Sequence, residues 1–451
     1  MLYRRIALLI LLMASPAWGA TYTVCASGCS ETTIQAVFDN NDLGANDIVE
    51  IAAGTYNEDV AVVAADSGTS SGRVTLKAAS GATVNIKSLH LTNVSYFDIQ
   101  NLIFTGAAAD GFWISSTEGN NIEITLSDCQ SNANGRHGFY IEDDGIARTV
   151  NKIVFERCTA LNNASGGFHI YSTANPTVFG SDGVLYDTCI SDGSGQTIDH
   201  HGFSAHGRVK NLTYRNCIAR NTNLVSAEGH GFVADDYVSN VMYLHCSAYS
   251  NDGHGFVVSH QDENGEGEYN SVIYSLAYNN LRGITVNGAA GGASNIRIWN
   301  NTIAGNTEAG ITLNATINSA AITNNIIANN GTYGITADEA GVTATASYNL
   351  IYGSGTAALN NITNSNGSTS DPILNAVYGI AGNSPAKDAG AVLYTYAAYP
   401  GDYLGHKIYG SGPDIGAVEY EDHTFGGWFF EMFMPTIMKL CASTNAACYT
   451  Q

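Results

Sequence analysis

Histidine is concentrated in one part of this sequence, and histidine is the side chain that exchanges protons near neutral pH. Nine of the 12 His lie between positions 137 and 260, namely His137, His169, His200, His201, His206, His230, His245, His254 and His260. Eight of the 18 Lys and Arg residues fall between 136 and 220, namely Arg136, Arg148, Lys152, Arg157, Arg208, Lys210, Arg215 and Arg220. Imidazole bases beside cations can remove a proton from an anionic substrate, so the stretch predicts a site for an acidic ligand.

His206 is expected to lie beside a carboxylate. It follows the apolar Ala205 in an alternating segment, and Asp235 follows Ala234 in the same way. If the two segments stack as parallel strands, equivalent outward side chains lie roughly 5 Å apart. The same pattern places Tyr171 one coil before His206 and Ser259 one coil after Asp235.

These residue types suit elimination from a uronic acid or its C5 epimerisation, which need a base, a proton donor and a cation at the carboxylate. His206 or His230 is the candidate base, and Tyr171 or Tyr237 the candidate donor. The candidate catalytic residues are His206, His230, Asp235 and Tyr171. The candidate substrate-binding residues are His201, Arg208, Lys210, Asp236, Tyr237, His254 and His260.

Other functions stay open. Inverting glycoside hydrolases use two carboxyl groups about 6.5 to 9.5 Å apart, and Asp235-Asp236 is the candidate pair. A third function is carbohydrate binding without turnover, as in an adhesin or surface protein. A His-Gly-Phe motif recurs at His137, His201, His230 and His254, so these histidines could also form a ladder that only stacks and hydrogen-bonds the backbone.

A metal site is a further candidate. Glu142, Asp143 and Asp144 are consecutive, and oxygen-rich loops suit Ca²⁺. The alternative is a solvated acidic loop, which is also the interpretation favoured for the acidic run 262–268.

The elements that position these residues are predicted by a repeat. Cys129, Cys158, Cys189, Cys217 and Cys246 follow one another at steps of 29, 31, 28 and 29. The position extends upstream to Asn101 and downstream to Ser275, Asn301, Asn325 and Asn349. A second strand follows in each coil, at Phe112, Phe139, Phe168, Phe203, Phe232, Phe256, Ile284, Ile311 and Ile335. Coils of 24 to 31 residues with two or three short strands predict an all-β, single-stranded, right-handed parallel β-helix of about 10 to 12 coils.

Departures from the shortest coil predict a groove. The coils at Phe203 and Phe232 return to the next coil by the shortest path, whereas the neighbouring coils carry long loops near 143–151, 171–183 and 259–270. The predicted floor of this transverse groove is residues 203–210 and 232–238.

The chain ends and the overall charge limit the class of protein. Residues 1–19 have the charged, apolar and small-residue regions of a signal peptide, which predicts a secreted protein, extracellular, periplasmic or on the cell surface. Two close pairs, Cys25 with Cys29 and Cys441 with Cys448, are candidate disulfides. A net charge of −22 argues against a nucleic-acid partner. No segment is long and apolar enough for a transmembrane span, and we expect a monomer.

The whole mature chain resembles a secreted right-handed parallel β-helix protein of the pectate-lyase-like superfamily, and motifs near both ends match it. The motifs are Thr33-Ile34-Gln35-Ala36-Val37, Gly54-Thr55-Tyr56-Asn57-Glu58, Ser384-Pro385-Ala386-Lys387-Asp388-Ala389-Gly390 and Asp414-Ile415-Gly416-Ala417. The resemblance implies an N-terminal capping helix, a β-helix domain over 20–420, a C-terminal cap or tail over 421–451, and action on a polysaccharide.

Within that superfamily, Asp235-Asp236, Gly253-His254-Gly255 and Arg282 resemble the polygalacturonase-like branch. The branch's additional Asp would fall near His206, where this sequence has no carboxylate. Lyases of the superfamily commonly use Ca²⁺ with Lys or Arg, whereas His is the more abundant candidate here. A lyase or epimerase for an anionic polysaccharide is therefore favoured over a hydrolase.

Overall fold

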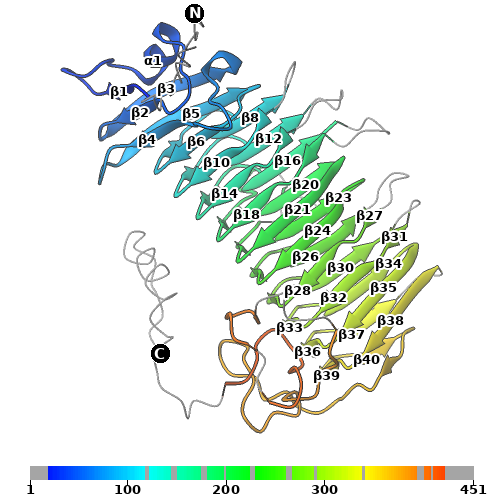
Figure 1. Cartoon of the computed structure of the whole chain (residues 1–451). Helices are drawn as coiled ribbons and strands as arrows, with labels where there is room; N and C mark the ends of the chain where they lie inside the picture. The colour runs from blue at the N-terminus through cyan, green and yellow to red at the C-terminus, as the bar shows by residue number, and fades with distance from the viewer. Residues whose placement is uncertain are drawn as a thin grey trace, which may run out of the picture.

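The chain forms a parallel β-solenoid in which each coil lies on the previous one, as the computed structural model shows (Figure 1). The structure describes residues 19–116, 121–143, 150–173, 180–197, 200–223, 229–260, 267–288, 292–337, 341–393, 401–407 and 410–421. The strands form one 19-stranded and one 22-stranded sheet, and every strand pair within them is parallel. The predicted signal peptide, Cys441, Cys448 and almost all of the predicted tail lie outside the described residues.

Some coils contribute one strand to the 19-stranded sheet, and others contribute two short strands in succession. Its strands are β1 (Thr21–Val24), β2 (Ile48–Ile51), β4 (Val74–Ala78), β6 (Phe97–Gln100), β9 (Asn121–Ile122), β10 (Ile124–Ser127), β13 (Val150–Asn151), β14 (Val154–Glu156), β17 (Ser181–Asp182), β18 (Leu185–Asp187), β21 (Val209–Arg215), β24 (Ser239–Leu244), β27 (Gly267–Glu268), β28 (Ser271–Ile273), β31 (Ala293–Ser294), β32 (Ile296–Trp299), β35 (Ile317–Thr323), β38 (Val342–Ser347) and β41 (Asn364–Ser365).

The 22-stranded sheet contains two rows joined by the long strands β3 (Gly54–Val63) and β5 (Val84–Thr92), since β5 pairs with both β7 and β8. One row is β7 (Ile103–Thr105), β11 (Gln130–Asn132), β15 (Thr159–Leu161), β19 (Ile190–Asp192), β22 (Ile218–Arg220), β25 (Ser247–Tyr249), β29 (Leu276–Tyr278), β33 (Thr302–Ala304), β36 (Ile326–Ala328) and β39 (Leu350–Tyr352). The other, called the site row here, is β8 (Phe112–Ser116), β12 (Phe139–Asp143), β16 (Phe168–Ser172), β20 (Phe203–Gly207), β23 (Phe232–Asp235), β26 (Phe256–His260), β30 (Ile284–Asn287), β34 (Ile311–Asn314), β37 (Tyr333–Ala337) and β40 (Ala357–Asn360). The coils that these rows define confirm the predicted fold class.

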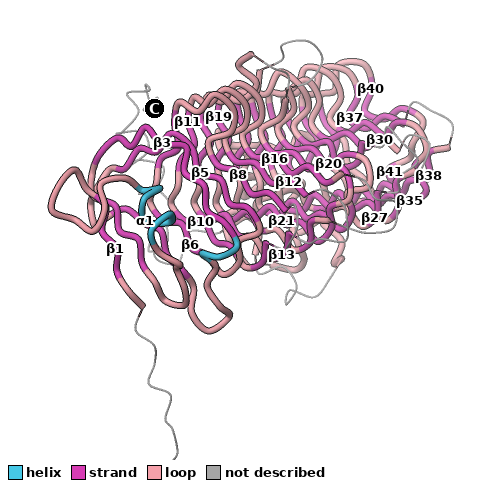
Figure 2. Tube along the Cα trace, turned by 90° about the horizontal axis from the view of Figure 1, so that it is seen from above, coloured by secondary structure: helices cyan, strands magenta, loops and turns pink. Residues whose placement is uncertain are grey.

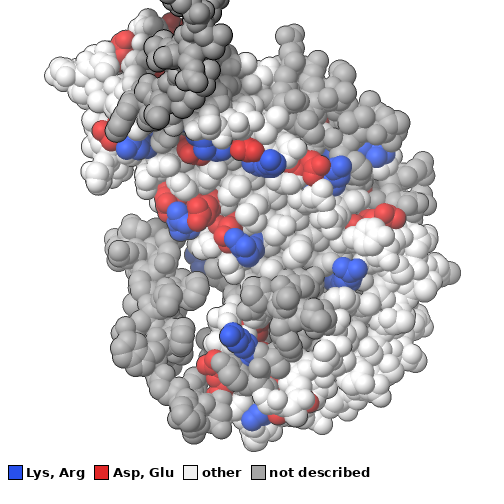
Figure 3. Space-filling model, viewed as in Figure 1, with Lys and Arg blue, Asp and Glu red and all other residues white. Residues whose placement is uncertain are grey.

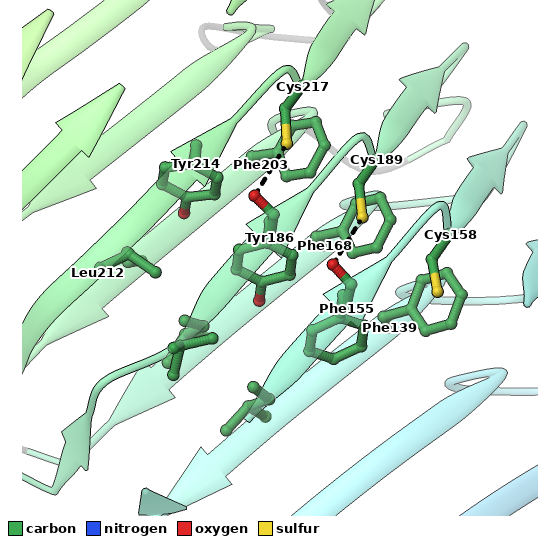
Figure 4. Packing of buried hydrophobic residues seen from close by; sticks show 14 of the residues in the cluster. Phe139, Phe155, Cys158, Phe168, Tyr186, Cys189, Phe203, Leu212, Tyr214 and Cys217 are labelled. Carbon is green, nitrogen blue, oxygen red and sulfur yellow. Dashed lines mark hydrogen bonds between the residues drawn. The ribbon is translucent and has the colours of Figure 1, made fainter. Parts of the chain in front are cut away.

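The site row is held in register by a stack of aromatic rings in the core. Phe139, Phe168 and Phe203 lie one above another, with ring centroids 4.8 and 4.6 Å apart. Tyr186 of the facing sheet packs edge-on against Phe168 and Phe203 (Figure 4). Because side chains alternate along a strand, fixing these rings inward also fixes which residues of the row point outward.

The repeated Cys and Asn positions are buried ladders, as predicted. Each ladder thiol contacts a backbone carbonyl of the preceding coil, for example Cys189 Sγ to Phe155 O at 3.3 Å (Figure 4). Further along, Asn325 Nδ2 donates to Asn349 Oδ1 at 2.8 Å. At the upstream end the prediction was wrong by one residue, because the amide of Gln130 bonds to Leu102 O and so stacks Cys129 on Leu102 rather than on Asn101.

The two ends of the solenoid differ. Helix α1 (Ile34–Asn40) lies at the N-terminal end (Figures 1 and 2), where Ile34, Val37 and Phe38 are buried, and a short 3-10 turn spans Ala64–Asp66. The predicted disulfide between Cys25 and Cys29 is present. The last strand ends at Ser365, and the described part of 366–421 packs against the outside of the coils, where Tyr403 Oη lies 2.6 Å from Ser247 Oγ. No helix in the described ranges is long and apolar enough to cross a membrane.

Candidate functional site

The outward residues of the site row bring His206 and Asp235 together. Tyr171, His206 and Asp235 occupy equivalent positions of β16, β20 and β23, and His206 Nδ1 lies 2.9 Å from Asp235 Oδ2. The neighbour on the far side is His260, not the predicted Ser259. The cause is a β-bulge in β26, where the register shifts by one residue and the outward positions shift with it.

The bond to Asp235 determines the tautomer of His206. A carboxylate only accepts, so Nδ1 of the neutral ring carries the proton and Nε2 holds the lone pair. Nε2 is shielded from solvent and has no hydrogen-bond partner among the described residues. The other oxygen of Asp235 accepts from the amide of Asp236 at 2.9 Å. Both carboxylate oxygens of Asp235 therefore accept hydrogen bonds, one from the His206 ring and one from the backbone that follows β23.

The predicted histidine ladder is present and makes backbone bonds. The rings of His201 and His230 stack at 5.0 Å, and those of His230 and His254 lie 4.6 Å apart. His230 Nδ1 accepts from the amide of His254 at 2.9 Å, and His137 Nδ1 accepts from the amide of Gly166 at 3.1 Å. A neutral imidazole that accepts at Nδ1 carries its proton on Nε2, so His230 presents a donor rather than a lone pair.

Three histidines that were not predicted as site residues meet beside His206. The ring centroids of His137, His169 and His200 lie 4.4 to 4.9 Å apart, and the ring of His169 is 5.1 Å from that of His206. Burial lowers the pKa of His137 and His169 well below the ordinary value and lowers that of His200 to about 3. All three rings are neutral at pH 7. The signal in the sequence was the coil at Phe168, where Gly166 replaces the ladder histidine.

Arg208 and Tyr237 lie at the same edge of the row as His206. The guanidinium of Arg208 stacks on the ring of Tyr237, 4.1 Å from its centroid. Lys210, by contrast, belongs to β21 of the other sheet, and its ammonium pairs with Asp182 at 3.3 Å. Tyr171 is 42% exposed, and the side chain of His260 lies outside what the structure describes.

The predicted positive site is largely neutralised. Of the eight cations named above, Arg148 lies outside the described residues, and six of the other seven pair with a carboxylate of the preceding coil: Arg136 with Asp110, Lys152 with Glu123, Arg157 with Asp128, Lys210 with Asp182, Arg215 with Asp187, and Arg220 with Asp192. Figure 3 shows such interspersed charges on one face. The expectation of cations gathered around the groove was wrong, because most of them form ladder ion pairs with the coil before.

The short connections of the predicted groove floor are present. Arg208 alone joins β20 to β21, and residues 236–238 join β23 to β24. The flanking connections 144–149 and 261–266, and most of 173–180, lie outside the described residues. The height of the groove walls therefore stays a prediction.

The acidic residues proposed for calcium do not fit that ion where they are described. Asp143 is fully buried, and its two oxygens accept from the hydroxyls of Ser172 and Ser181 at 2.9 Å each. Glu142 lies opposite Tyr171 in the row, and Asp144 lies outside the described residues. Among the residues that the structure describes, the side chains with metal-ligand spacing are instead those of His137, His169 and His200.

Comparisons with known proteins agree with the architecture. The family model described as "right handed beta helix region" matches residues 89–272. Among solved structures, the pectate lyase Pel9A is similar at a TM-score of 0.56 and 14% identity, over 90% of this chain and 97% of that one. The A-module of the mannuronan C-5 epimerase AlgE6 of Azotobacter vinelandii is similar at 0.55 and 17% identity, over 75% and 94%. At these identities the likeness shows the fold alone. No curated protein matches the sequence.

Proposed function

We propose that this right-handed parallel β-helix protein of the pectate-lyase-like kind removes the C5 proton of a uronate unit in an acidic polysaccharide. The outcome is either β-elimination or C5 epimerisation. The observation that carries the proposal is the bond of 2.9 Å between His206 and Asp235, which leaves the lone pair of His206 on Nε2. The two similar structures reported above, a pectate lyase and a mannuronan C-5 epimerase, support a reaction of this class.

In the proposed mechanism substrate binding opens access to His206 Nε2, which is shielded from solvent in the free chain. Nε2 then takes the proton from C5, and the electron pair of the C–H bond moves into the carboxylate as an enolate-like charge. Arg208 neutralises that charge, since preorganised cations stabilise charge that develops in the transition state. Asp235 holds the imidazole and stabilises its charged form. It acts through His206 and is a positioning residue.

The proton balance separates the two outcomes. In elimination Tyr171 donates a proton to the O4 leaving oxygen, the C4–O4 bond breaks, and a C4–C5 double bond forms. In epimerisation a proton returns to C5 from the opposite face and no bond of the chain breaks. Tyr171 is the proposed donor because it lies next to His206 in the register of the row and is partly exposed.

The rival functions predict different contacts. A hydrolase needs one carboxyl group that holds a proton and one that activates water. Asp235, the first of the candidate pair, instead binds His206 and the amide of Asp236. Binding without turnover gives no role to Nε2 of His206, which has no hydrogen-bond partner among the described residues.

The test is a panel of pectate, alginate and glycosaminoglycans, followed for unsaturated products by ultraviolet absorbance and for epimerisation by NMR. We expect turnover of at least one uronate polymer by the natural chain and its loss in His206→Gln. New reducing ends without unsaturation would instead establish a hydrolase. Binding with neither product, across the whole panel, would leave only the non-catalytic function.

We also propose that the protein is secreted. The support is the predicted signal peptide together with the Cys25–Cys29 disulfide, a bond that persists in oxidising compartments.

A further inference from the structure

We propose that His137, His169 and His200 bind one transition-metal ion of the class that prefers imidazole ligands, such as Zn²⁺. One ring nitrogen from each of the three residues lies within 4.8 Å of the others. The three come from consecutive coils, in the turn before β12, on β16 and in the turn before β20. Three imidazoles are a ligand set suited to Zn²⁺, Cu²⁺ or Ni²⁺, and one that a calcium ion does not favour.

A missing side chain lets two of the rings approach each other. The ladder position before the site row holds His137, His201, His230 and His254, but the coil between the first two has Gly166. A Cβ atom placed on Gly166 would crowd both rings, at 3.0 Å from His137 Nδ1 and 3.2 Å from His200 Nδ1. Zinc–nitrogen bonds are about 2.0 to 2.1 Å, so the three rings would have to move closer together to bind one ion.

The surroundings of the three rings fit a ligand role. Ser204 Oγ lies 2.8 Å from His169 Nδ1 and 3.4 Å from His200 Nδ1, and an outer contact of this kind can orient a ligand ring. The amide of Gly166 now donates to His137 Nδ1, and an ion at that nitrogen would replace this one hydrogen bond.

This inference is independent of the proposed polysaccharide chemistry. The candidate base, His206, is not among the three residues, and metal binding is measured without substrate. An ion bound by three protein nitrogens keeps a fourth position for water or another ligand.

The experiment uses the full chain without an added histidine tag. Zinc affinity is measured by competition with a chromophoric chelator, and Co²⁺ is added separately as a spectroscopic probe. We expect one Zn²⁺ per chain and the visible absorption of Co²⁺ bound by nitrogen. His169→Ala should weaken zinc binding at least about 10- to 100-fold, because the loss of a residue that only orients a metal ligand already has an effect of that size.

Gly166→Ala is the sharper variant, because it keeps all 12 histidines and fills the space with a methyl group. It should weaken zinc binding while the circular dichroism spectrum stays that of the natural chain. Gly44→Ala is the matched control, since its added methyl group would meet nothing within 4 Å. Absence of zinc binding by the natural chain would overturn the proposal. An affinity in His169→Ala and Gly166→Ala equal to that of the natural chain would overturn it as well.

Discussion

At the scale of single residues, His206 and His230 show how one side-chain type acquires two roles. Both are imidazoles at outward positions of neighbouring coils. His206 donates from Nδ1 to a carboxylate, whereas His230 accepts at Nδ1 from the backbone. Only the first arrangement leaves a lone pair on Nε2 for proton removal.

Glutamine substitution should separate these roles. His206→Gln removes the base and should lower kcat by about 10²- to 10⁴-fold. In His230→Gln the side-chain oxygen can still accept the hydrogen bond from the amide of His254, so kcat should fall much less than in His206→Gln. Initial rates on the polymer identified by the panel, with both variants checked by circular dichroism, measure the difference. An equal decrease in kcat in the two variants would mean that the histidine ladder as a whole, and not His206 alone, supports the reaction.

The sequence predicted this part of the site well where side chains alternate regularly. The period of two placed His206 beside Asp235 and Tyr171 beside His206. The period of two gave the wrong neighbour at Ser259, because a bulge adds one residue to β26. No local feature of the sequence indicated this bulge. The prediction also left out His169 and His200, since the small residue at Gly166 that allows their approach did not reveal which side chains would meet there.

At the scale of elements, the buried Asn ladder connects each coil to the next through side-chain hydrogen bonds. Asn325 donates to Ile298 O and to Asn349 Oδ1, and it accepts from the amide and the side chain of Asn301. A buried polar group that loses its partner costs free energy of unfolding, so each member of such a ladder depends on the next.

Asn325→Ala should therefore lower the free energy of unfolding by about 3 kcal/mol, because it leaves several buried donors and acceptors unpaired. Asn318→Ala is the matched control on the exposed surface of the same coil, where a change of about 0.5 kcal/mol or less is expected. Urea denaturation followed by fluorescence gives both values. A similar shift in the two variants would contradict the structural importance of the ladder.

The Cys ladder makes a separate prediction. Burial raises the pKa of Cys129, Cys189 and Cys246, and all five ladder thiols are inaccessible to solvent. A chromogenic thiol reagent should find no reactive thiol of this ladder in the native protein. In denaturant without reductant it should find five if Cys441 and Cys448 form the predicted disulfide, and seven if they do not. Rapid native reaction of the ladder thiols would contradict their burial.

At the scale of the whole molecule, the described C-terminal segment packs against one side of the solenoid. It brings several buried carboxyl groups with it. Ala417 bonds to Thr302 Oγ1, and the amide of Glu419 bonds to Asp402. Burial, and then the charge of Asp414, raise the pKa of Glu419 to about 9. The predicted β-helix domain of residues 20–420 included this region, but the last strand of the described residues ends at Ser365. No repeat remains beyond it to predict how an irregular segment packs.

Stability should consequently fall as the pH rises. The folded protein holds the Glu419 proton more tightly than the unfolded chain, whose Glu titrates near 4.5. The stabilisation from the neutral carboxyl is fully present below that value and is lost as the pH approaches about 9. In Glu419→Gln the neutral side chain remains at every pH, so Tm should fall less between pH 5 and 9 than in the natural chain. Parallel Tm curves for the two proteins would contradict this assignment.

The central claim is that the protein exchanges the C5 proton of a uronate, and NMR in deuterated water tests it most directly. With the natural chain and its polymer, the C5 proton signal should disappear, and an unsaturated C4 proton should appear as well if elimination occurs. His206→Gln should leave the C5 signal unchanged. Cleavage of the polymer by the natural chain with the C5 proton fully retained would contradict the account.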